Sequence, residues 1–156
     1  MDVRRAGNDD VPALVAELWL PFYRELAALD EWDALTDADL ATEGREHFER
    51  ALDREDVVVL LATDDEVSGF ATVERRRAPP IVDRNAVVHV HELYVRPRDR
   101  RNGVATALLQ RAEKLCRDVG CDGVELAVHP ENDRAYRLYE SVGFRSTRHR
   151  MVKRVE

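Results

Sequence analysis

The chain has 156 residues, of which 44% are hydrophobic and 35% are charged, with only 7 Gly and 6 Pro. This length suits one domain with a sizeable core, and the composition excludes a disordered, collagen-like or low-complexity chain. The longest apolar runs fall far short of the roughly 20 residues that a membrane-spanning helix needs, and the first residues lack the basic and apolar regions of a signal peptide. We therefore expect one domain over residues 1–156 that is soluble and cytoplasmic and does not act on a membrane.

The charges are unevenly distributed along the chain. The net charge is −7, which argues against nonspecific binding to nucleic acid. Residues 1–56 hold 16 Asp and Glu against 6 Lys and Arg, whereas residues 57–156 hold 15 against 18. The second part is therefore where we expect an anionic ligand. Cys116 and Cys121 are too few for a disulfide framework, and we expect them to be buried thiols.

The first half of the chain predicts a strand, two helices and a hairpin. A short strand over 3–5 is followed by a helix that starts at Asn8 or Asp9 and whose regular apolar spacing lapses around Pro21. Thr36 and Asp39 resemble a capping box that opens a second helix. The β-branched runs at 57–63 and 67–75, with Asp64 and Asp65 between them, predict the hairpin.

The second half predicts alternating strands and helices. Strands are expected at 86–95, 123–128 and 148–155, and helices at 104–119 and 132–141. No internal repeat or linker marks a domain boundary. The fold class is therefore α/β (α+β): a single domain with a mixed, mostly antiparallel sheet flanked by helices.

An anion-binding turn is expected where the strand at 86–95 gives way to the long helix. The backbone N–H groups of the first helical turn have no partner within the helix, and they converge on one place. Gly103 can adopt a positive φ, and the small side chain of Ala105 leaves the backbone accessible. Neither a dinucleotide fingerprint nor a P-loop is present, so a purely structural turn is the alternative. The nearby arginines that would add charge are Arg96, Arg98, Arg100 and Arg101.

Three pieces of sequence together resemble the GCN5-related N-acetyltransferase (GNAT) superfamily. They are His91-Glu92-Leu93-Tyr94-Val95-Arg96-Pro97, then Arg100-x-x-Gly103-x-Ala105, then Asn132-x-x-Ala135-x-x-x-Tyr139-x-x-x-Gly143-Phe144. They occur in the order and spacing of that superfamily over about residues 87–146, and the elements expected before them fit its first half. Two positions depart from the common pattern: Arg101, where many members carry Gly, and Ala105, in place of a second Gly.

The resemblance implies that the protein binds acetyl-coenzyme A as co-substrate. No metal is expected, because no third ligand at suitable spacing accompanies His89 and His91. The diphosphate would lie on the backbone amides of residues 101–106, and the pantetheine arm would lie along a strand that splays from its neighbour, bonded to the main chain of Leu93 and Val95. The thioester would end near Asn132 and Tyr139. The implied cofactor-binding residues are Leu93, Tyr94, Val95, Arg100, Arg101, Asn102, Gly103, Val104, Ala105, Thr106, Asn132 and Tyr139.

Acetyl transfer to an amine requires a neutral nitrogen and a proton for the leaving thiolate. A lysine-like amine has a pKa of about 10.4, so exposing its neutral form at neutral pH costs about 4–5 kcal/mol. His89 and His91 alternate along one strand face, which suits a proton relay, and the stretch also resembles the paired-histidine strand of arylalkylamine N-acetyltransferases. Glu92 is a further candidate catalytic residue, ranked behind the histidines because it faces the opposite way unless a bulge turns it. The alternative is that both histidines are packed side chains.

Tyr139 is the candidate general acid, because the matching tyrosine of the family is placed to protonate the departing thiolate. The alternative is an aromatic core residue on the apolar side of its helix.

The acceptor is expected to be a small-molecule amine or a protein amine. An acidic, aromatic region of the first helices would attract a cation; its members are Trp19, Phe22, Tyr23, Glu25, Asp30, Glu31 and Trp32. A noncatalytic acyl-coenzyme A sensor on the same fold is the rival hypothesis, and a nucleic-acid-binding protein is disfavoured by the net charge. Many relatives are dimers, so a homodimer is expected only by analogy.

Overall fold

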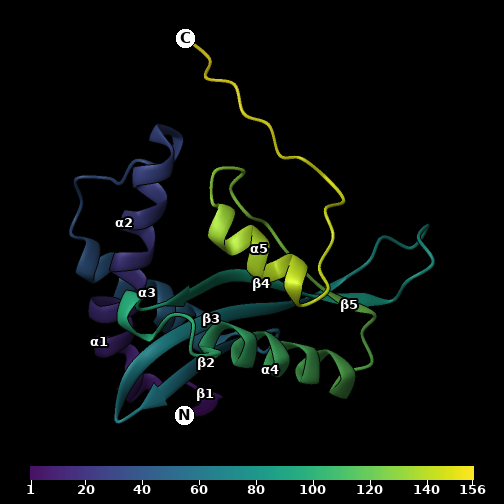
Figure 1. Ribbon diagram of the computed structural model, residues 1–156, viewed down its shortest axis with the longest axis horizontal. Coiled ribbons are helices and arrows are strands. Elements are labelled where there is room, and N and C mark those ends of the chain that lie inside the picture. Colours follow the sequence, from purple (N-terminus) through teal and green to yellow (C-terminus); the bar gives the residue numbers. More distant parts are fainter.

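A five-stranded sheet forms the centre of the molecule in a computed structural model that describes residues 1–156 (Figure 1). The strands lie in sequence order, and every neighbouring pair is antiparallel except β4 and β5, which are parallel. This is the mixed, mostly antiparallel sheet that the sequence predicts. The strands are β1 (Asp2–Arg5), β2 (Val57–Asp64), β3 (Glu66–Arg77), β4 (Ala86–Val95) and β5 (Gly123–Leu126).

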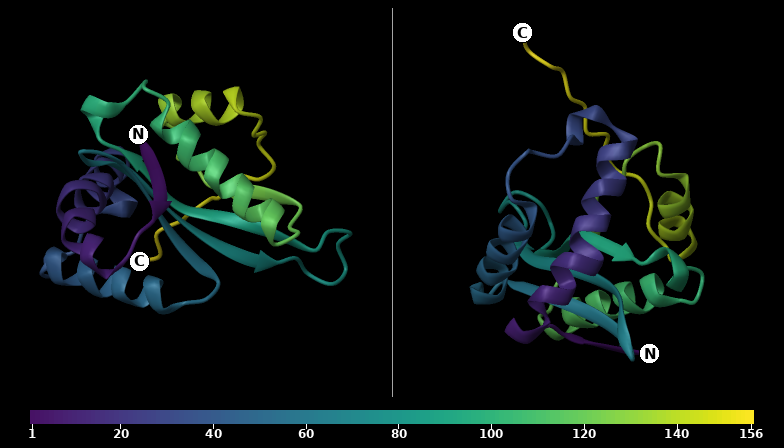
Figure 2. Two further views of the ribbon diagram at one scale, coloured as in Figure 1. Left: turned by 90° about the horizontal axis from the view of Figure 1, so that it is seen from below. Right: turned by 90° about the vertical axis from the view of Figure 1, so that its left-hand side faces the viewer.

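Helices cover both faces of the sheet (Figure 2). One face carries α1 (Val11–Ala13), α2 (Leu20–Leu29) and α3 (Leu40–Asp53), and the other carries α4 (Val104–Asp118) and α5 (Asp133–Ser141). Short 3-10 turns, η1 (Asn8–Asp10), η3 (Glu31–Asp33) and η4 (Pro97–Asp99), connect these elements. None of the helices combines the length and the apolar character that a membrane span requires.

The first helix continues past Pro21, where the sequence analysis expected its regularity to lapse. A π-helical turn, η2 (Leu14–Trp19), joins α1 to α2, and Leu20 N–H bonds Val15 O, five residues back. Proline lacks an N–H and its ring collides with the carbonyl four residues earlier in a regular α-helix. The wider π register directly before Pro21 is compatible with both constraints, so the helical stretch continues to Leu29.

Because helices cover both faces of the sheet, consecutive residues of its inner strands are buried. Leu60 and Ala62 of β2 pack toward α4, whereas Val59 and Leu61 pack toward α1–α3. The period-two alternation of a strand thus supplies two cores, and neither face needs polar residues.

The cap of α3 lies one turn later than Thr36, the residue predicted to open that helix. Asp39 is the N-cap: its side chain accepts a hydrogen bond from Thr42 N at 3.3 Å, and another from the Thr42 hydroxyl at 2.8 Å. Thr36 bonds only Ala38 N, within the preceding loop. A carboxylate that accepts two bonds makes the stronger cap.

A bulge in β4 changes which side chains face α1–α3. Thr72 of β3 pairs with Glu92 and the next residue, Val73, pairs with Val90, so His91 is left without a partner. A bulge reverses the alternation beyond it. Val90 faces α4, and Glu92 lies on the α1–α3 face together with His89. The bulge that would turn Glu92 to the face of His89 is therefore present.

The predicted strand at 148–155 is wrong. Residues after Gly143 form no helix or strand, and the sheet ends at β5. The stretch does not alternate apolar with polar residues, so a strand there would have no apolar face to bury. Met151 is 90% exposed and Val155 is 87% exposed.

The expectation of two thiols is also wrong, because Cys116 and Cys121 form a disulfide. Gly120, with φ of +71°, ends α4 and reverses the chain. The reversal brings the N–H of Cys121 to 2.9 Å from the carbonyl oxygen of Cys116, and their Cα atoms to 5.0 Å. The disulfide connects the last turn of α4 to the loop that precedes β5.

A substitution at Gly69 can test how tightly β3 is packed against the C-terminal end of β4. A Cβ at this position would lie 2.7 Å from the carbonyl oxygen of Tyr94, whereas a Cβ at Gly123 would meet nothing within 4 Å. We predict that Gly69→Ala lowers the free energy of unfolding by about 1–3 kcal/mol. The control Gly123→Ala should change it by less than about 0.5 kcal/mol. Urea unfolding curves of the two variants give the comparison. Equal midpoints would contradict the prediction, because they would show that a methyl group at position 69 fits beside the carbonyl oxygen of Tyr94 without strain.

Candidate active site

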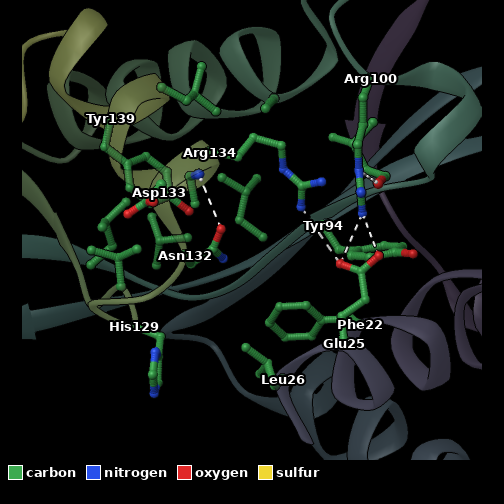
Figure 3. A pocket seen from close by; sticks show the side chains of 18 of the residues that line it. Phe22, Glu25, Leu26, Tyr94, Arg100, His129, Asn132, Asp133, Arg134 and Tyr139 are labelled. Atoms are coloured by element: carbon green, nitrogen blue, oxygen red, sulfur yellow. Dashed lines mark hydrogen bonds and ion pairs between the residues drawn. The ribbon is translucent and has the colours of Figure 1, made fainter. Parts of the chain in front are cut away.

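A cleft opens where β4 and β5 separate. The two strands pair only from Val87–Gly123 to Val90–Leu126. Beyond that point β4 continues to Val95, whereas the chain after β5 turns toward α5. A cavity of about 1140 Å³ lies between them, lined by β4, the chain after β5, α2, α5 and the start of α4 (Figure 3). This volume is slightly above the range of about 300–1,000 Å³ that is typical of small-molecule sites.

The free edge of β4 presents backbone hydrogen-bonding groups to this cleft. Arg96 N–H bonds Ser68 O on the β3 side. In an antiparallel pair alternate residues point to opposite edges, so the N–H and C=O groups of Leu93 and Val95 point to the cleft. Val95 O already accepts a bond of 2.8 Å from Arg100 Nε. The N–H and C=O groups of Leu93 and the N–H of Val95 therefore remain for a ligand.

The turn before α4 has the geometry of an anion-binding nest. Arg101 has φ of +65° and Gly103 has φ of +79°, so two left-handed residues flank Asn102. No side chain caps α4, and residues 101–103 are exposed. The backbone amides at the start of the helix are therefore unpartnered and accessible. The left-handed region disfavours residues with a Cβ, so Arg101 holds a backbone conformation that glycine adopts more easily.

Three of the four arginines expected to add charge here are bound to carboxylates. Arg96 lies 2.9 Å from Asp99 and 3.5 Å from Glu66, and Arg98 also pairs with Glu66. Arg100 donates to both carboxylate oxygens of Glu25, at 2.8 and 3.0 Å. Arg101 is left as the unpaired guanidinium of the group.

Glu25 joins two sides of the cleft. It accepts the two bonds from Arg100 and lies 3.7 Å from Arg134 Nη2 on α5 (Figure 3). A hydrogen bond of 3.0 Å between His129 Nε2 and Asp30 Oδ2 connects the loop before α5 to the end of α2. The sequence analysis missed Arg134 and His129, because nothing in their spacing indicates that α5 faces α2.

Asn132 and Tyr139 lie on α5, and both line the cleft. The side chain of Asn132 caps the helix by accepting a bond of 3.2 Å from Ala135 N, which leaves its NH₂ group free. Burial raises the pKa of Tyr139 to about 12. The phenol is therefore fully protonated at neutral pH, as a proton donor must be.

The two histidines of β4 differ in their access to the cleft. Their ring centroids are 4.6 Å apart, but His91 lines the cleft and His89 does not. His91 Nε2 lies 3.2 Å from Glu74 Oε1. Burial, followed by the charges of Arg76 and His91, lowers the pKa of His89. His89 Nδ1 lies 3.3 Å from Glu125 but without the alignment of a hydrogen bond.

Glu92 is the centre of a buried polar network that the sequence analysis did not foresee. Its side chain is 2% exposed and accepts bonds from Trp19 Nε1 at 3.0 Å and Tyr23 OH at 2.7 Å, with His47 Nε2 at 3.0 Å. Burial alone would raise the pKa of Glu92, but the hydrogen bond and charge of His47 and the bond from Tyr23 outweigh it, and the pKa lies below the usual value. The carboxylate is thus held charged among three donors, outside the cleft lining.

Comparison with known proteins identifies the family. The model of the family described as Acetyltransferase (GNAT) matches residues 13–144. An uncharacterized N-acetyltransferase of Archaeoglobus fulgidus is 29% identical over 146 residues, which are 93% of this chain and 93% of that protein. Mycothiol acetyltransferase of Brachybacterium faecium is 37% identical over 131 residues, which are 83% of this chain but 37% of that protein. The chain belongs to the GNAT acetyltransferase family.

Solved structures show the same fold. The BH1408 protein of Bacillus halodurans, as a tetramutant, superposes with a TM-score of 0.86 at 23% identity, covering 99% of this chain and 100% of that chain. The aminoglycoside N-acetyltransferase AAC(6')-Iy in complex with CoA has a TM-score of 0.72 at 21% identity, covering 99% of each chain. A predicted acetyltransferase of Clostridium acetobutylicum with acetyl-CoA has a TM-score of 0.73 at 20% identity, covering 98% of this chain and 95% of that one.

The turn before α4 can be tested by a matched pair of glycine substitutions. Gly103 and Gly120 both have positive φ, of +79° and +71°, and neither has an atom near its missing Cβ. They lie at opposite ends of α4, and only Gly103 lines the cleft. We predict that Gly103→Glu abolishes acetyl-CoA binding measured by calorimetry, because a carboxylate would stand in the anion site. Gly120→Glu carries the same strain and charge and should retain binding; equal losses would refute the assignment.

Glu74 gives a prediction on acid stability. Hydrogen bonds, first from Arg76 and then from His91 and Arg54, outweigh partial burial and lower the pKa of Glu74 from 4.5 to about 2. A carboxyl whose folded pKa is lowered stabilises the fold above its unfolded pKa, and this contribution disappears as the pH falls through the folded pKa. We predict that Glu74→Gln lowers the Tm above pH 4.5 and that its deficit against wild type shrinks as the pH falls toward 2.

The control for this measurement is Glu49→Gln, because Glu49 is exposed and has one long ion pair of 3.9 Å. Its Tm should follow that of wild type across the range. A Glu74→Gln deficit that stays constant down to the acid limit would contradict the lowered pKa.

Proposed function

We propose that the protein is an N-acetyltransferase that moves the acetyl group of acetyl-CoA directly to a primary amine while both substrates are bound. The observation that carries this proposal is the cleft itself: unpartnered amides before α4, free backbone groups on β4 and the protonated Tyr139 line one cavity. These are the groups needed to hold an anionic, amide-containing thioester and to protonate its thiolate.

The donor would be held mainly by backbone groups. The diphosphate suits the amides of residues 101–106, supported by the unpaired Arg101, and the pantetheine amides suit the free groups of Leu93. Tyr94 and the capping residue Asn132 would flank the acyl end. Arg100 would be a positioning residue, because its hydrogen bonds to Val95 O and to Glu25 hold the turn before α4 against α2. The fold neighbours with bound CoA or acetyl-CoA support this choice of donor.

Tyr139 would be the general acid. A thiol has a pKa near 8.5, so its anion is already a tolerable leaving group, and a proton from the phenol would assist its departure without being essential.

His91 is the better placed of the candidate bases, because it lines the cleft and His89 lies behind it. In this proposal His91 accepts a proton from the amine through water and passes it to His89. Glu92 does not face the cavity; it would position Trp19 and Tyr23, and the ring of Tyr23 packs against Phe22 of the cleft lining.

The acceptor would be a cationic amine entering past α2. Phe22 and Glu25 line the cleft there, and Asp30 lies at its rim. An aromatic ring and carboxylates attract an ammonium group. The names of two relatives, an aminoglycoside N-acetyltransferase and a thialysine N-epsilon-acetyltransferase, are consistent with an amine acceptor.

The role of Tyr139 can be separated from its packing. We predict that Tyr139→Phe lowers kcat by about 10²-fold, the lower end of the range for general acids, and leaves the Kd for acetyl-CoA unchanged. Tyr136 lies on the same helix, is 38% exposed and bonds Ser146, so Tyr136→Phe is the control and should retain kcat. An unchanged kcat in Tyr139→Phe would remove the acid role.

The proposed function is tested by measuring thiol release from acetyl-CoA across a panel of amines. Turnover with at least one amine is expected. Binding of acetyl-CoA with no turnover on any amine would indicate a noncatalytic acyl-CoA sensor instead.

A further inference from the structure

The segment after α5 is strongly basic and lies free of the sheet. Residues 145–156 hold five Lys and Arg and one Glu. They form no helix or strand and are exposed throughout. We call residues 145–156 the basic segment. In Figure 1 it leaves the end of α5 and runs toward the end of α2, on the other side of the cleft.

An acidic stretch lies where the basic segment ends. Residues 30–39, which we call the acidic segment, hold five Asp and Glu and no Lys or Arg. The guanidinium of Arg154 lies 5.8 Å from the ring centroid of Trp32, which is 47% exposed. This cation–π contact and the opposite charges bring the two segments together at the rim.

The contact lies beside the proposed acceptor entrance. Trp32 is two residues from Asp30, whose carboxylate pairs with His129 at 3.0 Å, and His129 lines the cleft. Lys153 directly precedes Arg154, and one residue of extended chain spans about 3.3–3.6 Å. The backbone of Lys153 therefore lies beside the contact that Arg154 makes with Trp32.

We infer that the protein acetylates its own Lys153, within one molecule. This inference rests on the proposed function and adds to it a particular acceptor, a lysine in a basic segment held by the acidic segment. The chain has only two lysines, and the other, Lys114, lies on α4 and pairs with Asp118 at 2.9 Å.

The step is the same transfer that the cleft would perform on any amine. Neutral Nζ of Lys153 attacks the thioester carbonyl carbon of acetyl-CoA; a C–N bond forms and the C–S bond breaks. The nitrogen loses its proton through water to His91, and the thiolate takes the proton of Tyr139. The products are free CoA and an uncharged amide at Lys153. The loss of positive charge next to Arg154 weakens the attraction to the acidic segment.

The experiment is incubation of the full chain with acetyl-CoA alone, followed by intact mass measurement and peptide mapping. One acetyl group is expected on Lys153, at a rate per molecule that does not depend on protein concentration. Lys153→Arg should abolish the modification, and the control Lys114→Arg should leave it unchanged. Trp32→Ala should slow it about two- to fivefold, the factor for an exposed cation–π contact, and Trp32→Phe should restore it.

Several results would overturn the inference: no modification, equal modification of Lys114, a rate that rises with protein concentration, or a rate undiminished in Gly103→Glu, which would indicate uncatalysed acetylation. Thiol release with small amines, run in parallel, separates the two claims. If small amines are acetylated and Lys153 is not, only this inference fails; if neither reacts, the proposed function fails with it.

Discussion

The site depends on the separation of β4 from β5 after four paired residues. Up to Val90 and Leu126 the parallel pair forms an ordinary ladder, and beyond it the edge of β4 has no partner strand. Backbone groups without partners are costly to bury, so a strand edge of this kind either faces water or is satisfied by a ligand. The same separation directs β4 and the chain after β5 to different walls of the cleft, and the turn of residues 101–103 follows directly from the end of β4.

Electrostatics distinguish the two sides of the cleft that we propose for the acetyl donor and for the acceptor. On the donor side the arginines before α4 are mostly neutralised by Glu25, Glu66 and Asp99, so the backbone amides and Arg101 carry the attraction for an anion. On the proposed acceptor side the acidic segment holds five Asp and Glu and no Lys or Arg of its own. Glu25 and Asp30 contribute to both sides, because Glu25 also pairs with Arg134 and Asp30 also contacts His129 of the opposite wall.

Much of the fold was predictable because its elements carry strong periodic patterns. The strand at 86–95 matches the predicted bounds, and α4 follows its apolar period to Asp118. The exposed turn and the cleft location of Tyr139 could be anticipated from the family resemblance. The strand predicted at 148–155 is absent, because a strand needs an apolar face to bury or a neighbouring strand to pair with, and this stretch has neither.

The remaining features of the site depend on contacts that are distant in the sequence. The bulge at His91 exists only in the pairing of β3 with β4, and no single-strand pattern shows it. The network around Glu92 joins α3 and the first helical stretch to β4, across separations of 45 to 73 residues. His47 looks like an ordinary inward residue of α3 until Glu92 is turned toward it. Such networks specify how helices sit on a sheet, and a single sequence gives little signal for them.

The most direct measurement is a titration of the isotopically labelled protein with acetyl-CoA, followed by the backbone amide resonances in NMR spectra. The account predicts that the amides of residues 101–106 and of Leu93 shift together, with one Kd, while those of β1 and of the loop between β2 and β3 stay in place. Saturable binding that leaves the amides of residues 101–106 unmoved, with shifts on another face, would contradict it.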